Sequence, residues 1–493
     1  MSAVNPPAAR PLRILFATPE CAPWVKTGGL GDVCGALPKA LAQRGHDVRV
    51  LMPAFPVFAP LLHSPLQTLR LPAQGPWPAA RLHRVDAQGI QLWLLDVPSL
   101  YDRPCGPYLD EGGQDFADNA ERFGMLSHVA ARLSHAASPC TDWPVDVLHC
   151  HDWTTALAPA YLLEMAGRHR RAATVMTIHN LLFQGLFPSH LAPMLDMPPP
   201  WLTVDPGLMH WDRLCFLKAG LRCADRITTV SPTYAREIQQ TQQGCGLDGM
   251  LRLRSADLVG ILNGIDTEQW DPAQDPLIAQ TYDAGTLSRK LRNKVVLRER
   301  LGLDQDDDQM LLGLVSRMTA QKGIEWLIAI LPALLEEGCQ VCVLGSGDKA
   351  LEEQMAELAR DHPGRVAVRI GFDEGLAHLI EAGADAFLMP SVFEPCGLNQ
   401  LYSQAYGTPP IVHAVGGLAD SVHEHVADGN GFVFTAPAAE AFLSAVKRAH
   451  AVYRQPQRWL RVQRNAMALD RSWGRSAQQY EAVYEAARLR AGH

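Results

Sequence analysis

The sequence predicts an α/β protein made of two doubly wound, Rossmann-like domains. Short apolar, β-branched runs alternate with helix-like stretches, which is the pattern of parallel strands buried on both faces. The alternation restarts near Leu311, and 493 residues exceed the usual size of one domain. We therefore expect residues 1–260 and 261–472 to form two such domains that face each other across a deep, ligand-binding cleft.

The expected strands follow from the apolar runs. In the first half they are residues 13–18, 48–53, 145–150, 173–178 and 226–230. In the second half they are residues 311–315, 340–344, 366–370, 386–390 and 410–413.

Helices and a linker are predicted in further segments. Helices are expected over 33–44 and 473–490, and over 287–301, where the leucine spacing indicates a surface helix. The polar segment 266–308 is expected to link the two halves.

Composition excludes several classes of protein. The formal net charge of −8 argues against a general nucleic-acid-binding protein. The first residues have no apolar core of a signal peptide, and no apolar run approaches the ~20 residues that span a bilayer. The 11 cysteines are scattered, which is typical of reduced thiols. We expect a cytoplasmic protein that binds neither nucleic acid nor membranes.

The first candidate site is the run Lys26-Thr27-Gly28-Gly29-Leu30-Gly31-Asp32 between the first strand and the first helix. Glycines there let backbone N–H groups approach an anion, and Lys26 adds a positive charge. The run matches neither the dinucleotide fingerprint nor the Walker A pattern. From spacing alone, an anion site and a plain tight turn are equally good interpretations.

Two candidates lie in the second half. Arg317 and Lys322 follow its first strand on one loop, where they can grip a diphosphate and stabilise a leaving group that gains negative charge. Glu394 follows a later strand and can accept hydrogen bonds from sugar hydroxyls. The structural alternatives are an ordinary basic turn and a carboxylate that caps the following helix.

Polar residues also end two strands of the first half. His151-Asp152 and His179-Asn180 stand where buried strands rarely finish in polar residues unless these face a cleft. A satisfied structural role remains the alternative for each histidine. Neighbouring residues of a strand point to opposite faces, so residues 149–152 are not expected to converge on a metal ion. Asn263 is, by chemistry alone, a turn former.

Together these motifs resemble those of the bacterial glycogen synthases and plant starch synthases, glycosyltransferases of family 5 with the GT-B fold. The resemblance extends from about residue 12 to about residue 485. It rests on Lys26–Leu30, His151–Trp153, Thr177–Asn180, Asn263–Asp266, Ser316-Arg317 with Gln321–Gly323, Glu394–Leu398 and Gly416–Leu418.

The resemblance implies transfer of glucose from ADP-glucose to the non-reducing end of an α-1,4-glucan such as glycogen. The configuration at the anomeric carbon is retained, and no metal or other cofactor takes part. Residues 1–260 are then the acceptor-side domain of the starch synthase catalytic type, and 261–472 bind the nucleotide sugar. A helix at 473–493 crosses back to the first domain. The alternatives are a GT-B transferase that uses UDP-glucose or another acceptor, and a catalytically silent glucan-binding homologue.

The resemblance also assigns roles to individual residues. Arg317 and Lys322 bind the phosphates, Glu394 contacts the donor sugar, and His179 lies near the transferred glucose. Residues expected to bind substrate elsewhere in the cleft are Lys26, Gly28, Gly29, Asp32, Asp152, Asn180, Asn263, Phe372, Cys396, Gly397 and Leu398.

Among the positions that depart from the family pattern, three bear on donor binding. Phe372 stands where some members have a tyrosine against the adenine, so stacking is kept and a hydroxyl contact is lost. His413 and Val415 stand where the family often carries Arg and Thr. Valine has no hydroxyl for the donor phosphate, and the change at His413 is expected to weaken donor binding.

Overall fold

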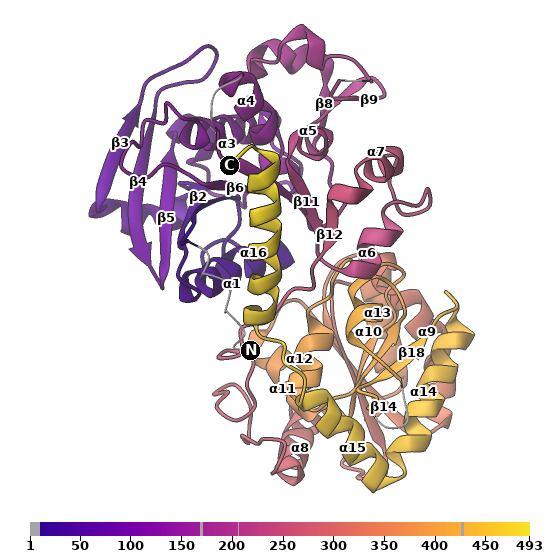
Figure 1. Cartoon of the computed structure of the whole chain (residues 1–493). Helices are drawn as coiled ribbons and strands as arrows, with labels where there is room; N and C mark the ends of the chain where they lie inside the picture. The colour runs from indigo at the N-terminus through magenta and orange to yellow at the C-terminus, as the bar shows by residue number, and fades with distance from the viewer. Residues whose placement is uncertain (1–9, 168–170, 206, 425–427) are drawn as a thin grey trace, which may run out of the picture. The chain divides into compact units, whose positions relative to one another are not determined.

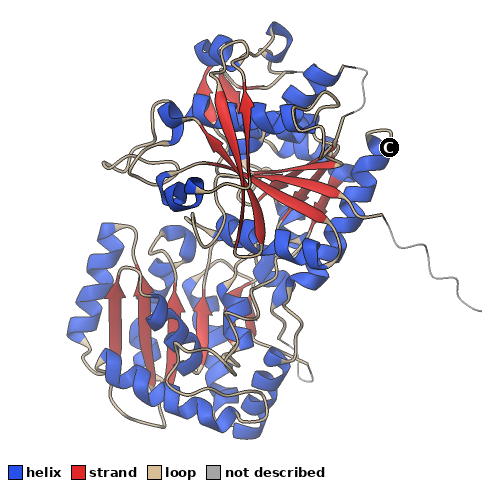
Figure 2. Cartoon of the chain, turned by 90° about the vertical axis from the view of Figure 1, so that its left-hand side faces the viewer, coloured by secondary structure: helices blue, strands red, loops and turns tan. Residues whose placement is uncertain are grey.

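The computed structural model describes residues 10–167, 171–205, 207–424 and 428–493. The chain forms two compact units, each built around its own parallel sheet with helices on both faces (Figures 1 and 2). Unit 1 comprises Met1–Val230, Ala235–Ile261 and Trp473–His493, and unit 2 comprises Ser231–Tyr234 and Leu262–Ser472.

Unit 1 contains a nine-stranded sheet in the order β12-β11-β7-β6-β1-β2-β5-β4-β3. Its strands are β1 Arg13–Ala17, β2 Asp47–Pro53, β3 Gln67–Leu71, β4 Ala80–Ala87, β5 Ile90–Asp96, β6 Val147–His151, β7 Ala173–Ile178, β11 Arg226–Thr229 and β12 Leu258–Gly260. Neighbours from β12 to β5 pair in parallel, and β4 and β3 extend the sheet with antiparallel pairing.

The remaining elements of unit 1 cover this sheet or extend from it. A small antiparallel sheet has the order β8-β10-β9. Its strands are β8 Leu186–Pro188, β9 Met209–His210 and β10 Arg213–Cys215. The helices are α1 Gly29–Gln43, α2 Pro98–Tyr101, α3 Asn119–Ser134, α4 Leu157–Ala166, α5 Phe216–Cys223, α6 Pro232–Glu237, α7 Asp248–Leu253 and α16 Trp473–Arg490.

The last helix, α16, packs against α1 and β7 of unit 1 (Figure 1). Tyr484 hydrogen-bonds through its hydroxyl to His149 Nδ1 at 3.0 Å, inside the core. Arg44 donates two hydrogen bonds of 2.7 Å to the carboxylate of Glu481. The chain therefore returns to its first unit after passing through the second.

Unit 2 contains a six-stranded parallel sheet in the order β15-β14-β13-β16-β17-β18. Its strands are β13 Met310–Val315, β14 Cys339–Gly345, β15 Val366–Ile370, β16 Ala386–Met389, β17 Pro410–His413 and β18 Phe432–Phe434. Numbered within the unit, this is the order 3-2-1-4-5-6 of a doubly wound dinucleotide-binding sheet. Its helices are α8 Lys290–Leu301, α9 Ile324–Glu336, α10 Lys349–Asp361, α11 Glu374–Gly383, α12 Asn399–Ala405, α13 Gly416–Ser421, α14 Ala439–Tyr453 and α15 Pro456–Met467.

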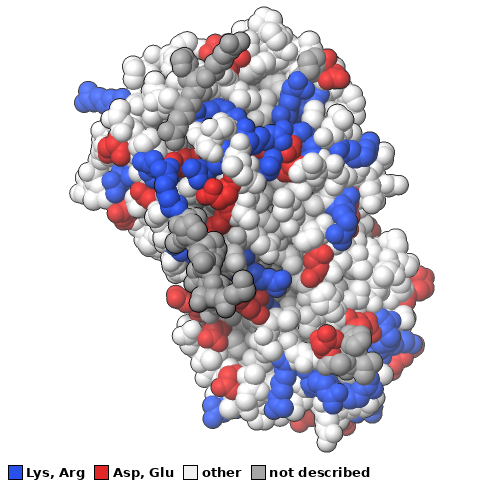
Figure 3. All heavy atoms as spheres, in the orientation of Figure 1, with Lys and Arg blue, Asp and Glu red and all other residues white. Residues whose placement is uncertain are grey.

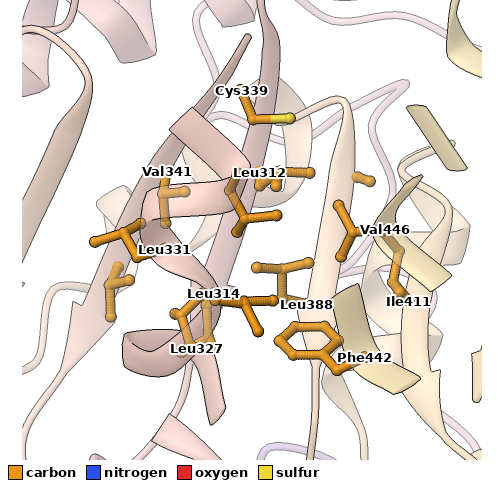
Figure 4. Close-up of a cluster of buried hydrophobic side chains, with 14 of the residues drawn as sticks. Leu312, Leu314, Leu327, Leu331, Cys339, Val341, Leu388, Ile411, Phe442 and Val446 are labelled. Carbon is orange, nitrogen blue, oxygen red and sulfur yellow. The ribbon is translucent and has the colours of Figure 1, made fainter. Parts of the chain in front are cut away.

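Both faces of the unit 2 sheet are buried, which explains the unbroken apolar runs of its strands. On one face Leu312 and Leu388 pack against Leu327 of α9 and Phe442 of α14 (Figure 4). On the other face Leu311 and its neighbours pack against α8 and α11. Most residues of the central strands are therefore buried on one side of the sheet or the other.

The ten strands predicted from the apolar runs all form, with ends shifted by at most two residues. The first helix begins at Gly29 instead of residue 33, because Gly29–Asp32 already form its first turn. The glycine-rich run is thus partly a helix N-terminus.

The expectation that residues 266–308 link the halves was wrong, because this stretch belongs to unit 2. Trp270 lies between the rings of His378 and Tyr402, with centroids 3.9 and 3.8 Å away. Helix α8 forms within the stretch 287–301 and lies at the surface, with one face exposed and the other packed on unit 2.

Three basic residues of α8 have partners on its packed face. Lys290 donates to the carbonyl of Ala382, Lys294 pairs with Asp385, and Arg298 donates to Gln340. These residues at i, i+4 and i+8 lie on the same face as Leu297, which is fully buried, whereas Leu291 is 52% exposed. Leucine spacing alone does not reveal the basic part of this face.

Surface charge is mixed. On the face seen in Figure 3, acidic and basic side chains are interspersed. Within the described ranges, no helix has both the length and the apolar character needed to cross a membrane.

Candidate active site

Many of the predicted site residues follow strands at the switch points of the two sheets, whereas His179, Asn263 and Phe372 follow β7, β12 and β15. In unit 1 the chain winds outward from β1 in both directions, toward β2 and toward β6. In unit 2 it winds outward from β13, toward β14 and toward β16. Ligands of doubly wound sheets bind at the carboxyl ends of the strands beside such points. The loops after β1, β6, β13 and β16 are therefore where a ligand is expected to bind.

A buried carboxylate that the sequence did not indicate holds the loop after β1. Glu20 is 3% exposed and accepts hydrogen bonds from the backbone N–H and the hydroxyl of Thr27 at 2.6 and 2.7 Å. It also accepts a 2.6 Å hydrogen bond from the hydroxyl of Tyr108. Glu20 thereby fixes the residues directly before Gly28. A lone glutamate in a turn gives no sequence signal for this role.

The glycine-rich run leads into α1 with its backbone accessible. Gly28 is extended and provides no side-chain cap, and a Cβ there would meet nothing within 4 Å. The first N–H groups of α1 are thus open to an anion. Lys26 Nζ lies 2.7 Å from Asp32 Oδ1, and burial raises the pKa of that carboxyl. The lysine that was expected to be available for phosphate is therefore partly neutralised by Asp32.

Asp152 and His179 come together because β6 and β7 are neighbours. The Asp152 carboxylate accepts a 2.7 Å hydrogen bond from the backbone N–H of His179 and another from that of Asn180. Burial nevertheless raises the pKa of Asp152 to about 7. Asp152 also has φ of +53°, a conformation that costs energy for a residue with a Cβ. Such strain beside a strand end is typical of functional sites.

The histidines of this edge are neutral. His151 Nδ1 and His179 Nε2 lie 3.0 Å apart, so one nitrogen donates and the other accepts. Burial lowers the pKa of His179 to about 3. His179 can therefore offer a neutral hydrogen bond to a ligand but no positive charge. His149 is bonded to Thr177 and Tyr484, which is the satisfied structural role.

In unit 2 the loops after β13 and β16 bring Lys322 and Glu394 together. Lys322 Nζ lies 2.5 Å from Glu394 Oε2, and the hydroxyl of Ser391 donates to the same oxygen at 3.0 Å. Their side chains are 17% and 8% exposed. Glu394 does not cap a helix, since α12 begins at Asn399 and the residue before it is Leu398. An ammonium group has three donors, so Lys322 keeps two for other acceptors.

Two glycines allow these loops to meet. Gly323 has φ of +70°, and a Cβ there would lie 1.9 Å from the carbonyl oxygen of Pro390. Gly416 has φ of +44°, and its Cβ would lie 1.9 Å from the carbonyl oxygen of Glu394. Any side chain at either position would push the loop of Glu394 away from Lys322 or from α13.

Arg317 and Phe372 are the exposed members of the predicted set in unit 2. Arg317 projects from the loop after β13, whose neighbour Met318 exchanges backbone hydrogen bonds with Ser346 and Asp348. Phe372 follows β15 and is 90% exposed. A phenyl ring this open to solvent is available for stacking on a planar ligand.

Asn263 and Cys396 are in contact. The backbone N–H of Asn263 donates to the thiol of Cys396, whose pKa burial raises to about 12. Asn263 is 8% exposed, and its Oδ1 has no hydrogen-bond partner among the described residues. Gly397 and Cys396 accept through their carbonyls from Gln400. The buried amide oxygen of Asn263 is thus available to a hydroxyl group.

His413 is buried behind the loop that carries Glu394 and is not exposed to a ligand. It is 4% exposed, its Nδ1 lies 2.8 Å from the carbonyl oxygen of Ser391, and its ring stacks on Phe434. Weaker donor binding from this departure stays a prediction. In the structure His413 contacts the segment that carries Glu394.

Within the described ranges, no group of three or more His, Cys, Asp and Glu side chains is arranged to hold a metal ion.

Comparison with known proteins matches both units. The starch synthase catalytic domain matches residues 13–253, and the glycosyl transferases group 1 family matches residues 297–464. The solved catalytic domain of Starch Synthase IV from Arabidopsis thaliana, bound to ADP and acarbose, is similar with a TM-score of 0.84. It is 29% identical and covers 97% of this chain and 100% of its own. The fold is GT-B, and the protein is a hexosyltransferase.

Bacterial relatives are closer in sequence. The glycogen synthase of Paracidovorax citrulli is 53% identical over 491 residues, which cover 97% of this chain and 96% of the relative. That of Aromatoleum aromaticum is 51% identical, with 98% of both chains covered. The chain belongs to the bacterial glycogen synthase family.

Proposed function

We propose that this protein transfers glucose from ADP-glucose to the non-reducing end of an α-1,4-glucan such as glycogen, with retention, and releases ADP. The observation that carries the proposal is the pair Lys322–Glu394 at the switch point of unit 2. A cation held there by a carboxylate suits a donor that carries both phosphate and sugar. The Arabidopsis starch synthase, which is similar over the whole chain, was solved with ADP and acarbose.

The leaving group sets the first requirement of the reaction. As the bond from the anomeric carbon to the phosphate oxygen breaks, negative charge grows on ADP. We assign Arg317 and the two remaining N–H groups of Lys322 to those phosphate oxygens, where fixed positive charge lowers the barrier. Phe372 stacks on the adenine. Its ring favours a planar base but makes no hydrogen bond to the edge of that base.

The sugar sets the second requirement. We assign Glu394, together with the backbone of Cys396, Gly397 and Leu398, to hydroxyls of the donor glucose. Glu394 is already occupied by Lys322 and Ser391. It is therefore assigned to orientation and not to attack on the anomeric carbon. The acceptor hydroxyl attacks from the side that the phosphate leaves, and the departing phosphate takes its proton.

We assign the unit 1 cluster to the same substrates. The amides at Gly28 and Gly29, with Lys26, bind the diphosphate side. Neutral His179 donates a hydrogen bond to the transferred glucose. Residues of unit 1 assigned to sugar or acceptor hydroxyls are Asp32, Asp152 and Asn180, and Asn263 of unit 2 has the same assignment.

We further propose that the reaction needs no metal ion and takes place in the cytoplasm. Two cations and helix amides supply the charge that a magnesium ion provides in other phosphate chemistry. All 11 cysteines are free thiols, as in a reducing compartment.

A donor comparison tests the proposal. The purified protein is incubated with glycogen and either ADP-glucose or UDP-glucose, with chelator present, and nucleotide release is measured. We expect release from ADP-glucose to be faster. Faster release from UDP-glucose would overturn the donor assignment, and no release from either would indicate a catalytically silent homologue.

A further inference from the structure

A hydrogen bond between two histidines joins the carboxyl ends of β6 and β7 in unit 1. His151 is the last residue of β6 and stands opposite Thr177 of β7, and His179 follows β7 directly. Side chains alternate along a strand, so Thr177 and His179 point to the same face of the sheet as His151. His151 Nδ1 and His179 Nε2 lie 3.0 Å apart, and the ring centroids are separated by 5.3 Å.

The ring of His151 is fixed in position. It is fully buried, stacks on Phe16 with centroids 5.1 Å apart, and lies 4.2 Å from the ring centroid of His149. Its Nε2 is closed to solvent and makes no hydrogen bond among the described residues. The bond from Nδ1 to His179 is therefore the one polar contact of this ring within the part of the chain that the structure describes.

His179 has one ring nitrogen that a ligand can reach. Its backbone N–H donates to Asp152 at 2.7 Å, and its Nε2 is occupied by His151. Its Nδ1 has no partner within the described ranges but, unlike His151 Nε2, is not closed to solvent. A ligand hydroxyl at this edge of the sheet therefore meets His179 Nδ1.

The hydrogen bond between the two rings decides where each proton sits. Burial lowers the pKa of both histidines, so each ring is neutral and carries a single N–H. If His151 donates from Nδ1, the proton of His179 is on Nδ1 as well, because its Nε2 accepts. If His179 donates instead, its Nδ1 is bare and the proton of His151 is buried on Nε2 without an acceptor. A buried N–H without an acceptor is rarer in proteins than an acceptor without a donor, which favours the first arrangement.

We propose that His151 is a positioning residue that keeps the proton of His179 on Nδ1, so that His179 donates a hydrogen bond to a sugar hydroxyl. In a neutral histidine, the hydrogen bond at one nitrogen determines which nitrogen carries the proton. Without His151, the Nε2 of His179 is free to take the proton, and Nδ1 then accepts from the hydroxyl instead of donating to it. The identity of the sugar, the glucose of the donor, rests on the function proposed above.

Nuclear magnetic resonance tests the tautomer without any substrate. The whole protein is prepared with ¹⁵N-labelled histidine, and the ring signals of His179 are identified by their loss in His179→Asn. Near neutral pH we expect His179 to be protonated at Nδ1 and bare at Nε2. In His151→Leu we expect a mixture of both tautomers. A proton on Nε2 of His179 in the wild type, or the same single tautomer in His151→Leu, would overturn the proposal.

Turnover tests the consequence for the reaction. His151→Leu should lower kcat with ADP-glucose and glycogen roughly tenfold, the effect of one lost hydrogen bond, and should change the KM for ADP-glucose less. Asparagine places an amide N–H near the position of Nδ1, so His151→Asn should recover part of kcat. Equal kcat in the two variants, or an effect on KM alone, would overturn the role of His151.

His128→Leu is the matched control for the loss of a buried imidazole. His128 lies in α3, is 1% exposed, stacks on Trp77, and has no hydrogen-bond partner for either ring nitrogen among the described residues. Its replacement should leave the His179 tautomer and kcat unchanged, and the free energy of unfolding in urea shows whether each variant is folded. A changed tautomer in this control would overturn the specific role of His151. A wild type that releases no ADP from ADP-glucose would refute the proposed function, whereas the tautomer of His179 would still decide the role of His151.

Discussion

Replacement of Lys322 by alanine is the sharpest test of the unit 2 site. Loss of one charged stabiliser of a leaving group lowers turnover by roughly 10²- to 10³-fold, which corresponds to about 2.7–4 kcal/mol. The structure adds a second effect. Glu394 would keep a carboxylate that is 8% exposed, with only Ser391 still donating to it. Breaking a buried ion pair in this way costs about 3–5 kcal/mol of folding stability. The cost is expected to be smaller here, because the Lys322 side chain is partly exposed and water screens the pair.

A double-mutant cycle separates these effects. Turnover is measured as ADP release at saturating ADP-glucose and glycogen, and stability as the free energy of unfolding in urea. Lys322→Ala with Glu394→Gln should recover part of the lost stability, since no buried charge remains, but no turnover. Lys349→Ala is the control, because Lys349 pairs with Glu352 while 82% exposed, and its loss should change neither quantity. Turnover close to wild type in Lys322→Ala would refute the leaving-group role.

Three further predictions follow from single residues. Phe372→Ala should raise the KM for ADP-glucose about 3- to 10-fold with unchanged stability, because its ring is exposed; an unchanged KM would exclude adenine stacking. Asp152→Asn should become more stable relative to wild type as pH rises from about 4 to 7, by up to about 1.4 kcal/mol per pH unit. The free energy of unfolding in urea, measured at several pH values for both proteins, tests this. A difference that does not change with pH would contradict the raised pKa of Asp152. His413→Ala should lower kcat more than it changes the KM for ADP-glucose, whereas His413→Asn should restore part of kcat; a change in KM alone would instead indicate direct contact with the donor.

The sign of the Asp152 prediction follows from linkage. The folded pKa of about 7 lies above the ordinary 3.8, so the folded protein holds a proton that the unfolded chain has released between these values. Stability from this group therefore falls as pH rises through that window. Asparagine has no proton to lose, so its advantage grows with pH.

The fold was predictable where the strands are buried on two faces, whereas the partly exposed strands β3 and β4 were not predicted. A fully buried strand such as 173–178 appears in the sequence as a short apolar run, and turn residues separate it from the next element. Helix α8 was predictable, but its packed face was only partly so. Beside Leu297, this face carries Lys290, Lys294 and Arg298, whose partners are distant carbonyls and acids that no local pattern specifies.

The candidate site likewise has a part that the sequence predicted and a part that it did not. Motif residues after strand ends, such as Lys322 and Glu394, were found because parallel strands place their carboxyl ends together. Glu20, Ser391 and the supporting role of His413 were missed, because each acts through a contact far along the chain. These residues hold the motif residues in place, and only the three-dimensional structure reveals the contacts.

Transfer of glucose from ADP-glucose onto the non-reducing ends of glycogen can be measured with a donor labelled in its glucose. The labelled ADP-glucose is incubated with the protein, glycogen and a chelator, and the product is digested with β-amylase. We expect label to enter glycogen and digestion to release it as maltose, since β-amylase cuts α-1,4 bonds from non-reducing ends. No incorporation, or label that resists this digestion, would exclude the proposed transfer.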